Sequence, residues 1–332
     1  MNARPVLRAW LEFAACLAVI GYAGFNLTRY ADAIAEKTRL SASWTGLALL
    51  ATVTSLPELM TGASAVTVAS APNIAIGDVL GSAVFNLFLL ALVDLLRRGE
   101  SIYAHASRGH IVSAAFGIAL LGIVLIGLVL GDGGPAIGHV GWYSPAIIAA
   151  YALAIHAVLR YERGLTPAAL HMAPRHPHLT LRQAVLRYAL FAAAVVAAGA
   201  WLPFVGLDLA RAMGWSNTFV GTLFVALVTS VPEIVTTFAA VRIGALDMAI
   251  GGVLGSNLFD VVIVAVDDLL YVRGPILADV SPAHAISAAS AIVMSACVVA
   301  ALWVRPRRSR WPTAVLAALF LLNAWAVHRV AG

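Results

Sequence analysis

The sequence reads Thr54-Ser55-Leu56-Pro57-Glu58 inside one apolar stretch and Thr229-Ser230-Val231-Pro232-Glu233 inside another. Each copy is followed by a second motif, which reads Gly81-Ser82-Ala83-Val84-Phe85-Asn86 in the first case and Gly255-Ser256-Asn257-Leu258-Phe259-Asp260 in the second. A carboxylate costs about 2.5–3.5 kcal/mol on insertion into hydrocarbon. Because the same costly pattern occurs twice, we expect both copies to contribute to one shared cation site near the middle of a membrane.

The composition is that of an integral membrane protein. Of the 332 residues, 61% are hydrophobic and 11% are charged, whereas soluble domains carry about 25% charged residues. In a membrane protein the formal net charge of +5 reflects loop topology, so we expect a lipid bilayer as the partner and no nucleic acid. The only two cysteines, Cys16 and Cys297, lie in apolar stretches and give no disulfide framework.

The apolar stretches predict ten membrane-spanning helices, because about 20 apolar residues are needed for each crossing. We expect them at residues 7–28, 43–69, 74–96, 110–130, 142–160, 184–210, 217–240, 247–271, 283–304 and 311–329. The apolar run at the N-terminus is interrupted by Glu12 and lacks a small-residue cleavage site, so it is read as a span and not as a signal peptide.

The distribution of basic residues predicts the orientation of the chain. With the N-terminus outside, 16 of the 21 arginines and lysines fall on the cytoplasmic side, as the positive-inside rule requires. Arg4 and Arg8 count against this orientation but are outnumbered. We therefore expect both termini to face outward, in a plasma membrane of the bacterial inner-membrane type.

The motif spacing predicts an internal duplication. Glu58 and Glu233 are separated by close to half the length of the chain, and the second motifs are separated by almost the same interval. Residues 1–160 would form a first five-helix repeat, 161–183 a cytoplasmic linker, and 184–332 a second repeat. Because each repeat has an odd number of spans, the second enters the membrane inverted, which is typical of secondary transporters. The histidines of the linker have no regular metal-binding spacing, so it is read as a solvated connector.

Each Pro-Glu motif predicts a broken helix lined with oxygen atoms. Pro57 lacks an N–H and crowds the carbonyl of Val53, and Pro232 does the same to Val228. Freed carbonyls at membrane depth are tolerated only in a polar cavity or within protein. Thr54 and Glu58 are four residues apart and share a helix face. Carboxylate, hydroxyl and carbonyl oxygens are the hard ligands that suit Ca²⁺ and Na⁺.

The third and eighth spans add polar residues at the same helical spacing. Ser82 and Asn86 are four apart, as are Ser256 and Asp260. Together with the two glutamates, Asp260 brings the acidic groups to three, and no arginine or lysine lies within these four spans to neutralise them. A bound cation is the simplest partner, with protons as the alternative. The hydroxyl residues and the Gly77/Gly81 and Gly251/Gly255 pairs are also typical of close helix packing.

Residues 45–95 and 220–270 resemble the alpha repeats of the cation/Ca²⁺ exchangers, whose best-known branch is the sodium/calcium exchangers. The resemblance implies an antiporter in which Glu58 and Glu233 are the central Ca²⁺ and Na⁺ ligands. It further implies flanking roles for Asn86 and Asp260 and carbonyl ligands at Ala51 and Ala226. The remaining Na⁺ ligands that it implies are Thr54, Ser55, Ser82, Thr229, Ser230 and Ser256. In this family the first and sixth spans slide against the core, giving alternating access.

Several positions depart from the family pattern. Val53 and Val228 stand where the family usually has glycine, and Asp78 and Gly252 stand where asparagine is common. Asp78 precedes Ser82 by four residues, so it could face the same pathway as an additional cation attractant. The helix-end acids Asp94 and Asp268 are read as solvated residues or as linings of the two vestibules.

The coupling ion is the main open question at this level. Na⁺-driven Ca²⁺ exchange is the leading interpretation, and coupling to H⁺ or dependence on K⁺ are the alternatives. A cation channel or an ion sensor is less well supported, and neither a nucleophile–base arrangement nor a cofactor motif suggests an enzyme. The sequence defines no oligomeric state, and a single chain would suffice to form the site.

Overall fold

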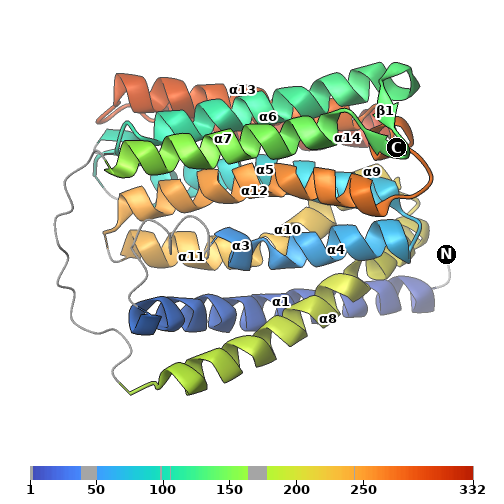
Figure 1. Cartoon of the computed structure of the whole chain (residues 1–332), viewed down its shortest axis with the longest axis horizontal. Coiled ribbons are helices and arrows are strands. Elements are labelled where there is room, and N and C mark those ends of the chain that lie inside the picture. The colour runs from blue at the N-terminus through green and yellow to red at the C-terminus, as the bar shows by residue number, and fades with distance from the viewer. Residues whose placement is uncertain are drawn as a thin grey trace.

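The structure, a computed structural model, describes residues 3–38, 51–97, 99–104, 106–163, 178–242 and 244–331. Figure 1 shows a bundle of helices that run roughly along one direction, with α8 tilted across α1. Within the described residues, eight helices are long and apolar enough to span a membrane. These are α1 (Ala3–Thr38), α5 (Pro72–Leu96), α6 (His110–Leu130), α7 (Tyr143–Arg163), α8 (Leu181–Met213), α12 (Leu246–Leu270), α13 (His284–Val304) and α14 (Trp311–Ala331).

The helix interruptions predicted at the two prolines are confirmed. In the second half, α9 (Asn217–Phe219), the π-helical segment η4 (Val220–Val225) and α10 (Ala226–Thr229) run up to the break, and α11 (Val231–Arg242) follows it at a bend of 47°. In the first half, α3 (Ala51–Thr54) is followed by α4 (Leu56–Thr67). Each helix restarts just before its proline, which fits the first turn because its N–H is not needed there.

The predicted ten-span arrangement is confirmed only in part. The bent segment of α9 to α11 would make a ninth crossing, while the predicted span 43–69 starts in residues outside the described part. At the predicted linker 161–183, α7 continues to Arg163 and α8 already begins at Leu181. The helices therefore take both ends of that segment, and His171 and His176 lie outside the described residues.

The two halves contain helices of matching length. α5 and α12 each have 25 residues, α6 and α13 each have 21, and α4 and α11 each have 12. Short 3-10 segments, η2 (Ile102–Ala104) and η5 (Ile276–Ala278), follow α5 and α12 at equal distance. The halves differ between α6 and α7, where η3 (Gly131–Gly133) leads into a hairpin of β1 (Ala136–Ile137) and β2 (Val140–Gly141).

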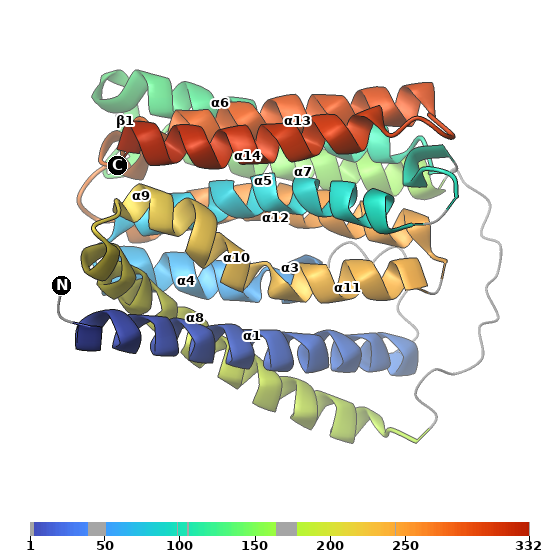
Figure 2. The same cartoon turned by 180° about the vertical axis from the view of Figure 1, so that it is seen from behind.

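The helices pack in layers that place the broken helices at the centre. Figures 1 and 2 show α4 and α11 between the α1/α8 pair on one side and α5 with α12 on the other. Beyond α5 and α12 lie α6, α7, α13 and α14. The largest apolar cluster lies among α5, α6, α12 and α13, whereas leucines, valines and tryptophans of the peripheral helices are exposed. This exposure suits a lipid-facing surface, because lipid tails are as apolar as these side chains.

Two glycines allow α1 and α8 to pack directly against the broken helices. A Cβ at Gly24 of α1 would lie 2.6 Å from Cγ of Pro232, and one at Gly199 of α8 would lie 3.1 Å from the carbonyl oxygen of Pro57. The two glycines occupy equivalent positions in the two halves, so each half packs its first helix on the break of the other half. Only a residue without a side chain permits so close an approach.

The helix-end acids are neither solvated nor exposed to a vestibule, contrary to the sequence interpretation. Asp94 and Asp268 are fully buried. Each accepts a backbone hydrogen bond at 2.8 Å from the first residue of the following 3-10 segment, Ile102 or Ile276. Each also accepts from a hydroxyl of a more distant helix, Thr313 for Asp94 and Ser144 for Asp268. A buried carboxylate is stable here because donors converge on its oxygens.

Candidate functional site

The residues singled out in the sequence come together where α3/α4, α10/α11, α5 and α12 meet. α5 and α12 contact each other here, because the Asn86 amide donates to the Asn257 side chain at 3.0 Å and Asn257 donates to the carbonyl of Ala83 at 3.1 Å. The α3/α4 and α10/α11 breaks face this contact. Every described side chain of the predicted ligand set is buried there, with Thr54, Ser55, Glu58, Ser82, Asn86, Thr229, Ser230, Glu233, Ser256 and Asp260 at most 3% exposed.

Glu58 and Glu233 are the carboxylates of this set that have oxygens without a hydrogen-bond donor. Glu58 is 1% exposed, and neither of its carboxylate oxygens has a hydrogen-bond partner. Glu233 is 2% exposed, and its Oε1 accepts a bond at 3.2 Å from the Ser256 hydroxyl, while Oε2 has no partner. Buried carboxylate oxygens without donors cost several kcal/mol unless a cation or a proton partners them. Three of the four glutamate oxygens are therefore available to bind a cation or a proton.

The hydroxyl groups link the two halves of the chain. The Thr54 hydroxyl lies 3.2 Å from that of Ser256, and the Ser55 hydroxyl donates to Asp260 Oδ1 at 2.8 Å. In the opposite sense, the Ser230 hydroxyl donates to that of Ser82 at 3.1 Å. Each pair joins a broken helix of one half to the long helix of the other, so the halves form one polar centre and not two.

The Ser55 contact shows why this residue does not cap α4. Ser55 stands at the N-cap position of α4, yet its side chain makes no capping hydrogen bond. Its hydroxyl is used by Asp260 instead. A capping serine normally contributes about 1 kcal/mol to helix stability. In α4 this local hydrogen bond is absent, and the Ser55 hydroxyl bonds to Asp260 of α12 instead.

Asp78 belongs to the centre, as its spacing suggested. It is fully buried, and the Thr229 hydroxyl donates to its Oδ1 at 2.7 Å while Oδ2 has no partner. The second half has Gly252 at the equivalent position. With Glu58, Glu233 and Asp260, the centre thus contains four carboxylates, and none of the ion pairs of the described chain involves them.

The backbone positions Ala51 and Ala226 lie in the short helices that precede the breaks. The carbonyl of Ala226 accepts from the Ser230 N–H at 3.1 Å, and the Thr229 hydroxyl oxygen lies 3.2 Å from it. It is therefore engaged in closing its own helix end. Ala51 is the first described residue of α3. The carbonyl ends of these short helices lie at the centre, where their negative dipole ends favour a cation.

The carboxylates are spread out in this conformation. Among the described residues, no group of three histidine, cysteine, aspartate or glutamate side chains lies close enough to hold one metal ion. A metal ion here would have to draw on the two glutamates together with hydroxyl, amide and carbonyl oxygens.

Two polar residues of this region were not predicted from the sequence. Asn257 joins α5 to α12 through the bonds described above, and the second motif contained it as the counterpart of Ala83. Asp267 lies further along α12, is fully buried, and has no partner for either oxygen. Its only sequence signal was its position two helical turns after Asp260, which places it on the same helix face.

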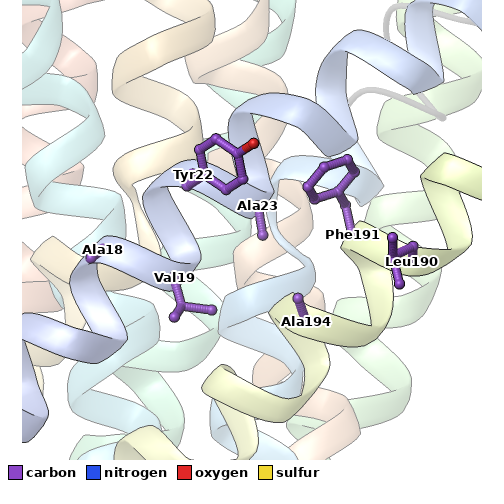
Figure 3. A pocket seen from close by; sticks show the side chains of 7 residues that line it. All are labelled: Ala18, Val19, Tyr22, Ala23, Leu190, Phe191 and Ala194. Atoms are coloured by element: carbon purple, nitrogen blue, oxygen red, sulfur yellow. The ribbon is translucent and has the colours of Figure 1, made fainter.

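A surface groove lies apart from the polar centre. A groove of about 350 Å³ lies between α1 and α8. Figure 3 shows the side chains that line it, Ala18, Val19, Tyr22, Ala23, Leu190, Phe191 and Ala194. Its lining is almost wholly apolar, so it lacks the oxygen ligands of a cation site. It lies between the two peripheral helices and does not include the polar centre.

Comparison with known proteins identifies the family. The family model described as sodium/calcium exchanger protein matches residues 8–160 and 183–328, which is most of the chain. This chain belongs to the sodium/calcium exchanger protein family. Among curated proteins, the inner membrane protein YrbG of Escherichia coli (strain K12) is 29% identical over 224 residues, covering 66% of this chain and 66% of that protein.

Solved structures show the same fold. The sodium-calcium exchanger NCX_Mj is 20% identical and superposes with a TM-score of 0.59, covering 96% of this chain and 98% of that one. The H⁺/Ca²⁺ exchanger CAX is 14% identical, with a TM-score of 0.71 over 97% of this chain and 85% of that one. At these identities the likeness concerns the fold alone. The predicted membership of the cation/Ca²⁺ exchanger superfamily and of an integral membrane class is confirmed.

Proposed function

We propose that this chain is a secondary-active antiporter that exchanges Na⁺ for Ca²⁺ at the polar centre, by alternating access. The observation that carries the proposal is the pair Glu58 and Glu233. These buried glutamates come from two broken helices of opposite halves, and three of their four carboxylate oxygens lack any donor. An ion pathway is the usual reason for such groups within a membrane protein.

The proposed ligands are two glutamates and the oxygens around them. For Ca²⁺ we assign Glu58 and Glu233 with the hydroxyls of Thr54 and Thr229, a set of hard oxygens that Ca²⁺ prefers. For Na⁺ the same carboxylates would act with the serine hydroxyls, the carbonyls of Ala51 and Ala226, Asn86 and Asp260. Sharing of the carboxylates would make the two ions compete, and competition is what an exchanger requires.

The number of carboxylates supports two alternatives, coupling to H⁺ or to K⁺. If Glu58, Asp78, Glu233 and Asp260 were all ionised, one Ca²⁺ would neutralise only half of their charge. Several Na⁺ ions, a K⁺ ion or protons would have to balance the rest, because uncompensated buried charge is costly. The excess of acidic groups is therefore the observation that supports H⁺ or K⁺ as a coupled ion, and the experiment below separates these ions.

The topology that we propose has ten spans in two inverted repeats, 1–160 and 184–332, joined by a cytoplasmic linker. The matched helix lengths and the reciprocal glycine–proline contacts support it, and α3 with α4 would form the end of the second span. We place both termini outside, on the basis of the arginine and lysine distribution. In this scheme α1 and α8 move against the broken helices at Gly24 and Gly199 to open either face.

The function is tested by ⁴⁵Ca²⁺ uptake into sealed proteoliposomes that contain the purified protein. Vesicles loaded with Na⁺ are diluted into Na⁺-free medium at matched pH, and vesicles loaded with choline serve as the control. Uptake that requires the outward Na⁺ gradient is the expected result. Because exchange is obligatory, collapsing the gradient with a Na⁺ ionophore should stop the uptake.

Two further gradients separate the alternatives. Uptake driven by an outward proton gradient in Na⁺-free vesicles would assign the coupling to H⁺ and contradict Na⁺ exchange. Uptake that needs K⁺ together with Na⁺ would identify K⁺ dependence. Ca²⁺ flux that persists without any counter-ion gradient would indicate a channel and would contradict antiport.

A further inference from the structure

Asp267 is an acidic group that the central site does not use. It lies in the last turns of α12, two helical turns beyond Asp260, or about 10 Å further along the helix axis. It is fully buried, and neither carboxylate oxygen has a hydrogen-bond partner. Its neighbour Asp268 provides the contrast, because four donors surround that carboxylate. An unpartnered carboxylate at such depth requires a partner of another kind.

The position of Asp267 is set by α4, the helix that carries Glu58. A Cβ placed on Gly62 would lie 2.5 Å from Oδ2 and 2.6 Å from Oδ1 of Asp267, so the carboxylate rests directly on the backbone of α4. Gly62 follows Glu58 by one helical turn and shares its face. Asp267 therefore lies between the same two helices that hold Glu58 and Asp260, one to two turns nearer one end of the bundle.

The opposite end of the bundle lacks this arrangement. In the other half of the duplication, the residue equivalent to Gly62 is Thr237 and the residue equivalent to Asp267 is Val93. Thr237 has a side chain where Gly62 has none, and Val93 is a buried apolar residue. A carboxylate packed against a glycine backbone is thus present at the end where α4 and α12 terminate, and its counterpart is absent at the end where α11 and α5 terminate.

The charges around Asp267 are negative. Asp78 on α5 and Asp268 on α12 lie close enough to Asp267 to interact electrostatically with it. Asp268 is saturated by its own donors, whereas Asp78 has a free oxygen. The combined field at this end of the bundle attracts cations and repels anions.

We infer that Asp267 is a second, transient binding position for the transported metal cation, between the central site and the membrane face at which α4 and α12 end. This second position would exist only toward the face at which α4 and α12 end, and not toward the opposite face. The inference rests on the proposed exchange function. Its consequence is that the two faces differ in their apparent affinity for Ca²⁺, although the central site is shared.

The test measures the half-saturating Ca²⁺ concentration for exchange separately at each face. Right-side-out and inside-out vesicles provide the two faces, and a Val272→Cys label marks the face of Asp267, because Val272 is 77% exposed beyond α12. For Asp267→Asn we expect an increase of about fivefold or more at this face, the size that one nearby unit charge gives. At the opposite face the half-saturating Ca²⁺ concentration should change by less than about twofold, which is smaller than the effect of one nearby unit charge.

Asp268→Asn is the matched control, because it removes a neighbouring buried carboxylate that lies outside the path. It should lower the melting temperature, and it should change the half-saturating Ca²⁺ concentration at this face less than Asp267→Asn does, because four donors offset the charge of Asp268. Asp267→Asn should not lower the melting temperature in cation-free buffer, because it removes an unpaired buried charge. A lower melting temperature with equal kinetic changes at both faces would show a structural role and would overturn the inference.

The remaining outcomes are also decisive. If wild-type protein exchanges ions and Asp267→Asn leaves both faces unchanged, the second position is wrong while the proposed function stands. A variant altered only in its pH dependence would show that Asp267 holds a proton and not a metal cation. If wild-type protein shows no exchange from either face, the proposed function fails and this inference fails with it.

Discussion

The two halves of the molecule share a scaffold but differ in where they place charge. Their long helices match in length, and buried Asp94 and Asp268 bind equivalent 3-10 segments at the same distance of 2.8 Å. The acidic groups of the proposed cation path do not match between the halves. The positions equivalent to Asp78, Asp260 and Asp267 are occupied by Gly252, Asn86 and Val93. The matched helix lengths agree with the duplication that we propose, and the unmatched acidic positions show that the two halves contribute different groups to the centre.

Substitution of Glu58 or Glu233 should have the largest effect on transport, and the effect should be equal for the two residues. Glu58→Gln or Glu233→Gln is expected to reduce Na⁺-driven Ca²⁺ uptake by more than the ~10–100-fold that loss of an outer-shell partner causes. The proteins should still insert and fold, because glutamine keeps the shape of the side chain. Uptake in proteoliposomes, normalised to folded protein, checks this. Wild-type rates in both variants would contradict the site assignment.

The two buried acids at the helix ends, Asp94 and Asp268, should contribute unequally to the stability of the protein. Asp268 accepts four hydrogen bonds, whereas Asp94 accepts side-chain and backbone bonds from two donors, Thr313 and Ile102. Each bond to a charged group contributes about 1.5–3 kcal/mol. We therefore expect Asp268→Asn to lower the melting temperature more than Asp94→Asn. Equal shifts, measured in detergent, would show that the number of donors does not set the effect.

Asp260 and Asn86 offer a milder comparison, because the first half already carries an amide at that position. Asp260→Asn should permit transport but change the half-saturating Na⁺ concentration or the pH dependence by about tenfold, or ~1.4 kcal/mol. Uptake as a function of Na⁺ and pH gives both values. Unchanged ion dependence would count against a coordinating role for Asp260.

The smallest effect should come from a pair of histidine contacts at the two ends of the bundle. His110 contacts Asp247 at 3.0 Å, and His284, its counterpart in the second half, contacts Asn73 at 3.1 Å. Because the Asp247 side chain is 59% exposed, its ion pair should contribute at most about 1 kcal/mol. Asp247→Asn should therefore change the melting temperature little, and a large decrease would show that this pair matters more than its mirror image.

The sequence predicted the parts of this molecule that depend on local pattern. Nine of the apolar segments, including the bent one, correspond to helices that qualify as spans, and the breaks occur beside Pro57 and Pro232. Helical spacing places the predicted ligand residues on one face of each helix, and the packing of the two halves brings these faces together. Their role in binding ions stays a prediction.

The features that the sequence did not reveal depend on contacts between distant segments. Asp94 and Asp268 looked like solvated helix ends, and only the packing of α14 and α7 supplies the hydroxyls that bury them. Asp267 is invisible as a special position until Gly62, which lies in the other half of the chain, is seen to rest against it. The same holds for Asn257, whose partners lie on α5.

The central claim is that both halves build a single cation site. Equilibrium ⁴⁵Ca²⁺ binding to purified wild-type protein and to Glu58→Gln and Glu233→Gln, with folding checked for each, tests it most directly. We predict that wild-type protein binds a single Ca²⁺ per chain with measurable affinity and that either substitution abolishes this binding. Two Ca²⁺ ions per chain, with one lost in Glu58→Gln and the other lost in Glu233→Gln, would show that each half has its own site and would contradict the account.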